Sequence, residues 1–365
     1  MILDFYFARR FATNFLLIGA VFLTLILLID LIEQLRRFEG VDVSFGQLFR
    51  LTLLNAPAAI SEILPLLMIL STIMLFVGLA RSSELVVTRA TGRSGIRALA
   101  GPLAVAALIG GLAVSTLNPI VAATSNRYQQ LADTYRTGGP AALSLSGEGL
   151  WLRQGSPRGQ SVIHATGYSD EPLTLYGVTI LTYAAGGGPV RRIMAQNARL
   201  DGDDWVLANV KVWPLIAGLN PETSADEHET LRLPTTLTQE RIRDSVGSAT
   251  GISIYDLPAT IRELAQAGFS TKRHEVWFQA ELARPLFLMA MVLVGAAFTM
   301  RHARFGGTGV AVLASVMLGF TLYFIRNFAQ ILGENGQIPV AMAAWAPPVA
   351  ATLLMMGLLL HAEDG

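Results

Sequence analysis

The sequence predicts an α-helical membrane protein with six transmembrane helices and a β domain inserted between the third and fourth. Three observations predict this fold class. Charged residues make up 15% of the 365-residue chain and hydrophobic residues 52%, whereas soluble domains carry about 25% charged residues. Six apolar runs are long enough to cross a bilayer. Between the third and fourth runs, short β-like stretches alternate with turn residues, which indicates a separate β domain.

The six spans fall into two groups of three, in residues 1–118 and 271–365. Aromatic and basic residues at positions 1–12 predict an interfacial helix that leads into the first span. Two prolines and Glu62 interrupt the second span. The spans are expected at residues 15–32, 51–79, 96–117, 276–300, 308–332 and 338–360.

The distribution of arginine predicts the orientation of the spans. Basic residues with few acidic neighbours precede the first span, and others lie between the second and third spans and between the fourth and fifth. Cytoplasmic loops carry the excess of Arg and Lys. We therefore assign both termini to the cytoplasm, and the large polar insert then faces outwards.

The insert, residues 119–270, is expected to be mainly β. Strands separated by clusters of turn residues are typical of a sandwich, a jelly roll or an open barrel. The acidic stretch 221–230 is expected to be a mobile loop, and residues 256–268 a helix that leads back to the membrane. Strands are predicted at residues 149–153, 161–165, 173–183, 190–200 and 205–213.

A short cytoplasmic helix is predicted at residues 81–92, between the second and third spans. Ser82 or Ser83 can cap its start and Gly92 can end it. A helix outside the bilayer gives another protein something to bind. The residues expected to make this contact are Glu84, Leu85, Val86, Val87 and Arg89.

Several function classes are disfavoured by what the sequence lacks. The chain has no cysteine, and its five histidines are scattered, so neither a thiol nucleophile nor a metal site is expected. No phosphate-binding loop is present, so an ATP-driven process would need hydrolysis by a partner. The formal net charge of zero argues against nucleic-acid binding. We expect no catalytic residue and no cofactor.

Ionisable residues within spans mark candidate functional positions, because an unpaired charge in hydrocarbon is costly. Asp30 and Arg326 lie near the outer ends of the first and fifth spans. They could line a polar cavity or pair as a gate, or each could reach separately to the interface. Glu62 lies deeper, between two prolines. It could border a cavity or hydrogen-bond to a neighbouring helix.

Four arginines are expected near the outer leaflet. Arg36 and Arg37 follow the first span, and Arg127 and Arg136 follow the third. Such a basic ring could hold the phosphates or carboxylates of a lipid head group. Ordinary interfacial anchoring is the alternative.

Several short motifs resemble the LptF/LptG permease family of the lipopolysaccharide exporter, and the resemblance covers nearly the whole chain. The arrangement of three plus three spans around an outward β domain supports it. Of the two homologous subunits, the tetrad 84–87 and the strand start 149–151 are more similar to LptG. The segments that carry the resemblance are 81–92, Asn118-Pro119, 147–151, Gly319-Phe320, Tyr323, Gly333 and Ile338-Pro339.

The resemblance implies a non-catalytic permease subunit of an ABC transporter in the inner membrane of a Gram-negative bacterium. Lipopolysaccharide would enter a cavity between this subunit and an LptF-like homologous permease. An LptB-like ATPase dimer would bind the 81–92 coupling helix from the cytoplasm. The β domain would be a periplasmic jelly roll that passes acyl chains to LptC-like and LptA-like proteins.

The chain departs from the family pattern at two positions. Family members often carry a basic residue at the position of Asp30 and an acidic one at that of Arg326, so both signs are reversed here. The reversal is compatible with a swapped pair. In the family, span one of one subunit faces span five of the other, so the partner of Asp30 could belong to the homologous permease.

Two other functions fit parts of the sequence. A membrane-anchored periplasmic binding or scaffold protein would transport nothing, but it would not need a capped cytoplasmic helix. A permease of another lipid or lipoprotein exporter would share the coupling helix. The usual lipoprotein permeases have four spans, and six spans around an insert fit that pattern poorly.

Overall fold

In a computed structural model, the chain divides into two compact units. The helical unit comprises Met1–Ala132, Thr250–Leu257 and Lys272–Gly365, and the β unit comprises Asp133–Ala249 and Pro258–Thr271. The structure describes residues 2–41, 43–90, 94–137, 143–146, 149–156, 159–169, 173–184, 188–202, 204–215, 220–235, 251–266, 270–300 and 308–364.

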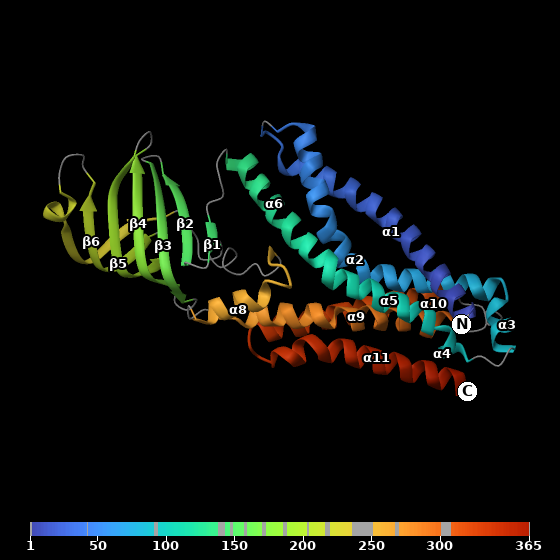
Figure 1. The fold of residues 1–365 in the computed structure, drawn as a ribbon. Helices are drawn as coiled ribbons and strands as arrows, with labels where there is room; N and C mark the ends of the chain where they lie inside the picture. The colour runs from blue at the N-terminus through green and yellow to red at the C-terminus, as the bar shows by residue number, and fades with distance from the viewer. Residues whose placement is uncertain are drawn as a thin grey trace. The chain divides into compact units, whose positions relative to one another are not determined.

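The first two spans are the long helices α1 (Ile2–Arg37) and α2 (Phe45–Arg81) (Figure 1). The expected interfacial helix is not separate from the first span, because α1 runs through both without a break. Pro57 and Pro65 lie inside α2, which also stays continuous. Neighbouring helices and local adjustments can satisfy the backbone groups that a proline frees in a membrane helix.

The third span contains a π-helical turn and continues well beyond its expected end. The chain was expected to leave helical structure after Pro119, at the boundary assigned to the insert. It remains helical to Thr137, because the three consecutive helical segments follow one another without a break and Pro119 comes directly after the π-helical turn. The elements are α3 (Glu84–Ala90), α4 (Gly95–Ala98), α5 (Ala100–Leu112), the π-helix η1 (Ala113–Leu117) and α6 (Asn118–Thr137).

The last three spans are α9 (Lys272–Thr299), α10 (Thr308–Glu334) and α11 (Val340–Asp364). Within the described residues, six helices are long and apolar enough to cross a membrane, which confirms the predicted spans. The most apolar stretch of α9 is 67% buried, compared with 0% for α1 and 17% for α10. Therefore α9 lies at the centre of the helical unit, while α1 and α10 have the least cover.

Both termini and α3 lie at the same end of the helical unit (Figure 1). An even number of crossings returns the chain to its starting side, so six spans account for this arrangement. The apolar core of the unit is built mainly from α2 and α9, with contributions from the amino-terminal part of α1 and from α11.

The predicted β domain is confirmed, and its described strands form one seven-stranded antiparallel sheet in chain order (Figure 1). The Greek-key crossovers of a jelly roll are not found among these strands. The helix predicted at 256–268 is α8 (Leu257–Gln266). The strands are β1 (Leu143–Ser146), β2 (Gly149–Ser156), β3 (Gly159–Ser169), β4 (Thr174–Ala184), β5 (Pro189–Asp201), β6 (Asp204–Pro214) and β7 (Asp226–Pro234).

The sheet curls so that strands far apart in its order come together. Gln154 on β2 donates to the Pro234 carbonyl at the end of β7 at 3.3 Å. The Thr235 hydroxyl donates to Gln154 Oε1 at 2.6 Å. The curl encloses an apolar core that includes the fully buried Trp205. One curled sheet therefore supplies the core that two separate sheets supply in a sandwich.

The backbone is irregular at one position on β4 and one on β6. Gly177 on β4 and Asn209 on β6 have φ angles of 58° and 52°, in the left-handed region. A Cβ atom at Gly177 would meet the Thr166 hydroxyl, so the position requires glycine. On β4 the buried residue after Leu175 is Val178, three positions later instead of two. The side chains that face the core are therefore at odd positions before this point and at even positions after it.

The stretch 221–230 is not a loop, contrary to the prediction. It forms a 3₁₀ turn, η2 (Pro221–Ser224), followed by β7. Lys211 Nζ lies 2.6 Å from Glu222 Oε1 and 3.5 Å from Glu227 Oε1, and Trp213 Nε1 donates to Glu222 at 2.7 Å. These contacts compensate the acidic charge that suggested a mobile segment.

Candidate functional site

One carboxylate fixes the short helix α3 to the first span. Ser83 has a φ of 59° and turns the chain between α2 and α3. The Glu84 carboxylate accepts hydrogen bonds from Ser82 Oγ at 2.6 Å and Tyr6 Oη at 2.7 Å. It also accepts from Arg10 Nη1 at 2.9 and 3.0 Å, and Arg10 donates to the Tyr6 hydroxyl at 2.6 Å. We call Tyr6, Arg10, Ser82 and Glu84 the Glu84 cluster.

These donors lower the pKa of the Glu84 carboxyl from 4.5 to about 2. The hydrogen bond from Ser82 is the largest cause, and those from Tyr6 and Arg10 act in the same direction, while partial burial opposes them. Glu84 is therefore ionised at neutral pH. The sequence interpretation missed Tyr6 and Arg10 as partners, although their spacing of four residues places them on one helix face.

The other residues predicted for partner contact do not form one surface. Leu85 is buried at 5% exposure in the apolar core of the helical unit, whereas Val87 is 63% exposed. The side chains of Val86 and Arg89 lie outside the described part of the structure. The Glu84 carboxylate and Leu85 are thus engaged with their own chain, and Val87 remains accessible.

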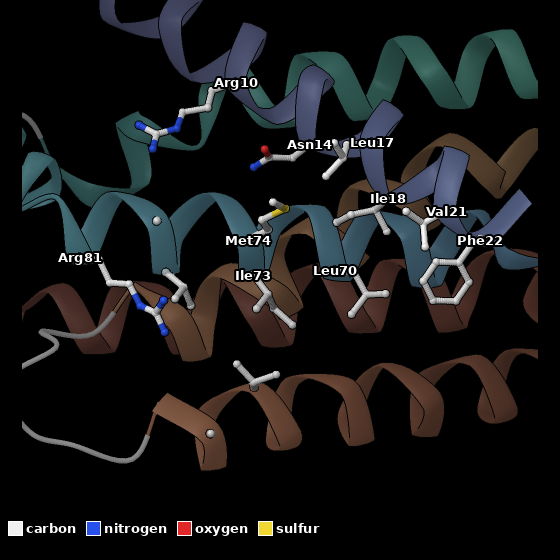
Figure 2. A pocket seen from close by; sticks show the side chains of 14 residues that line it. Arg10, Asn14, Leu17, Ile18, Val21, Phe22, Leu70, Ile73, Met74 and Arg81 are labelled. Carbon is white, nitrogen blue, oxygen red and sulfur yellow. The ribbon is translucent and has the colours of Figure 1, made fainter. Parts of the chain in front are cut away.

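An apolar groove of about 840 Å³ lies between α1, α2 and α10. Figure 2 shows Arg10 and Arg81 at one end and apolar side chains such as Leu17 and Val21 along the rest. Arg10 therefore belongs both to the groove and to the Glu84 cluster. The groove can accept an acyl chain along its apolar length.

Asp30 and Arg326, predicted to line a cavity or to pair, have separate neighbours. Asp30 Oδ1 accepts from Asn55 Nδ2 at 2.8 Å, and its buried Oδ2 has no hydrogen-bond partner among the residues that the structure describes. The guanidinium carbon of Arg326 lies 4.9 Å from the centre of the Phe287 ring, a cation–π contact. No ion pair joins Asp30 and Arg326 among the described residues, so the structure does not contain the pair within one chain.

A buried ion pair on α9 was not anticipated. Arg284 Nη2 lies 2.7 Å from Glu281 Oε1, and their side chains are 13% and 1% exposed. Arg284 also donates to Ser61 Oγ on α2 at 2.8 Å, and no hydrogen-bond partner of the buried Glu281 Oε2 is found among the described residues. The available sequence signal was two opposite charges three residues apart, on one face of an apolar helix.

Hydrogen bonds fasten residues 251–255, which precede α8, to the third span. Asn118 Oδ1 accepts from the Ile254 amide at 2.9 Å. The Tyr255 hydroxyl donates to the Ser115 carbonyl in the π-helix at 3.0 Å. Asn118 thus joins this segment to the third span, which gives the Asn118-Pro119 motif a structural role.

Glu62 borders a smaller cavity of about 190 Å³ between α2, α9 and α10. Pro65, Met291 and Tyr323 also line it. The hydrogen bonds found among the described residues include none from the Glu62 side chain. This position corresponds to the cavity alternative of the sequence interpretation.

Three of the four arginines of the predicted basic ring have described side chains. Arg37, at the end of α1, donates to the Tyr128 hydroxyl on α6 at 3.1 Å, which places it beside the part of α6 that carries Arg127. Arg36 is exposed at the same end of α1. The side chain of Arg136 lies outside the described residues.

Six spans in two groups of three, a β domain between them and a short helix fixed beside a lipid-sized groove define a multi-pass membrane protein of the permease type. Residues 5–361 match the family described as "Lipopolysaccharide export system permease LptF/LptG". The chain belongs to this family, which confirms the resemblance drawn from its motifs.

Two characterised relatives cover almost the full length. The chain is 23% identical over 369 residues to the lipopolysaccharide export system permease protein LptG of Haemophilus influenzae, covering 95% of this chain and 97% of that protein. It is 23% identical over 367 residues to LptG of Escherichia coli K12, covering 97% and 94%. The likeness to LptG agrees with the subunit to which the motifs pointed.

Proposed function

We propose that the chain is an LptG-like permease subunit of an ATP-driven exporter. It extracts lipopolysaccharide from the inner membrane and passes it to a periplasmic bridge. The family match over residues 5–361 carries this proposal, and the six helices long enough to cross a membrane support it. The subunit itself is not an enzyme and needs no cofactor, since a separate LptB-like ATPase dimer hydrolyses ATP.

In this proposal, the ATPase binds the end of the helical unit that carries α3, with both termini on the cytoplasmic side. The exposed Val87 supports this placement, because an apolar side chain on a short helix outside the spans suits burial in an interface. Arg81, at the end of α2, is also exposed. These two side chains offer an apolar and a charged contact.

An LptF-like homologous permease covers α1 and α10 in the assembled transporter. Both helices present large apolar side chains outwards, such as Leu28 at 54% and Phe324 at 66% exposure. Lipopolysaccharide then enters between the two subunits, and Arg36, Arg37 and Arg127 are placed to contact its phosphates. The β domain delivers it to LptC-like and LptA-like proteins.

Co-purification from native membranes tests this function. The tagged chain should recover an ATPase, a homologous permease and lipopolysaccharide, identified by mass spectrometry. Val87→Asp should reduce ATPase recovery, because it places a charge in the contact. Val190→Asp, at a 45% exposed position on β5, is the matched control. Recovery of the unaltered chain without an ATPase or a second permease would refute the proposal.

A further inference from the structure

The acceptor capacity of the Glu84 carboxylate is already filled within the chain. A carboxylate has two oxygens with about four lone-pair sites. Oε1 accepts from Ser82 and Arg10, and Oε2 accepts from Tyr6 and Arg10. A donor from another protein would have to displace one of these contacts. The geometry therefore argues against Glu84 as a direct ligand of an ATPase.

The same contacts hold α3 against the amino-terminal part of α1, so the two helices cannot move independently while the contacts persist. Tyr6 and Arg10 lie one turn apart on α1, while Ser82 and Glu84 stand at the junction of α2 and α3. Leu85 of α3 is buried in the same apolar core as Phe7 and Phe11 of α1. Displacement of α3 must either break these bonds or move the amino-terminal part of α1.

Arg10 connects this junction with the groove. Its guanidinium lines the arginine end of the groove, and the same group donates to Glu84. In Figure 2, Arg10 projects from α1, and Arg81 lies at the same end of the groove. Movement of Arg10 with Glu84 would therefore change the groove wall directly.

We propose that Tyr6 and Arg10 are positioning residues that bind Glu84 and transmit displacement of α3 to α1 and the groove. This inference rests on the proposed function and deepens it. The ATPase contact is assigned to the outward side of α3, and the Glu84 cluster is the internal connection that converts this contact into movement of the first span.

The test uses the whole transporter in liposomes and measures three quantities separately. These are the ATPase recovered with the permease, the rate of ATP hydrolysis, and the lipopolysaccharide released per ATP. Arg10→Ala should leave the first two near their original values and reduce release per ATP at least tenfold. Arg9→Ala is the matched control, because Arg9 is an exposed arginine one position away on the same helix.

Two further variants separate transmission from folding. Arg10→Lys keeps a charge that can reach Glu84 and should recover part of the release per ATP. Combining Arg10→Glu with Glu84→Arg restores opposite charges and should transport better than either single reversal. Equal loss in Arg10→Ala and Arg9→Ala would overturn the inference. So would normal release per ATP in Arg10→Ala, or loss of ATPase recovery in that variant. Failure of the unaltered chain to recover an ATPase would instead refute the proposed function.

Discussion

Glu84 shows how three donors can set the protonation of a partly exposed side chain. Its folded-state pKa of about 2 lies below the ordinary 4.5. A depressed carboxyl pKa stabilises the folded arrangement above the unfolded value, and this stabilisation is lost as pH falls through the folded value. The cluster should thus persist at neutral pH and dissociate between about pH 4.5 and pH 2.

Single substitutions should shift this titration in a defined order. Ser82→Ala removes the largest cause of the lowered pKa and should raise the pKa of Glu84 more than Tyr6→Phe does. Infrared difference spectra against Glu84→Gln can follow the carboxylate band between pH 7 and pH 2. An unaltered titration in Ser82→Ala would contradict the assigned cause.

At the scale of elements, a glycine sets the contact between the start of α1 and α5. A Cβ atom at Gly101 would meet the Asp4 carbonyl and approach the Ala8 amide to 3.0 Å. Gly101→Val should push α1 away and destabilise the protein by about 1–3 kcal/mol, the usual cost of overpacking. Thermal unfolding in detergent measures this change.

Gly111 provides the control for that substitution. A Cβ atom there meets nothing within 4 Å, and replacing glycine by alanine within a helix stabilises it by about 0.5–1 kcal/mol. Gly111→Ala should therefore keep or raise the unfolding temperature. A similar decrease of the unfolding temperature in both variants would show that glycine is required for a reason other than contact between the helices.

The end of the third span depends on Asn118. Asn118→Leu leaves the buried Ile254 amide without this partner, and an unsatisfied buried group costs about 1–3 kcal/mol. Faster hydrogen exchange at Ile254 and a lower unfolding temperature are expected. Ser115→Ala is the control, because its hydroxyl bonds to the Gly111 carbonyl of its own helix. Unchanged exchange at Ile254 would contradict this role.

The spans and strands β2 to β6 were predictable because each follows a local pattern, either an apolar run or alternation between turns. The predictions were wrong where a contact with residues far away in the sequence changes the structure or the accessibility that a local pattern indicates. Residues 221–230 look like an acidic loop until Lys211 and Trp213 are placed beside Glu222. Glu84 likewise looks available to a partner until α1 supplies Tyr6 and Arg10, more than seventy residues earlier.

At the scale of the whole molecule, the uncovered helices predict where a second permease binds. The chain has no cysteine, so an introduced cysteine is the only thiol in it that can react. Leu28→Cys and Phe324→Cys, on α1 and α10, should each cross-link to a homologous permease in membranes. Leu150→Cys, at a position 1% exposed in the β unit, should not. Absence of cross-links from both exposed positions would contradict the assigned interface.

The unbroken α1 has a mechanical consequence. It contains no proline, and Arg10 and Asp30 lie about 30 Å apart along its axis at 1.5 Å per residue. Gly19 lies near the midpoint, and a Cβ atom there would lie 3.9 Å from the Leu67 side chain of α2. A stiff rod that tilts by about 4° about its midpoint displaces each end by about 1 Å in opposite directions. A displacement of Arg10 towards the core of the helical unit would therefore move Asp30 in the opposite direction, away from the core.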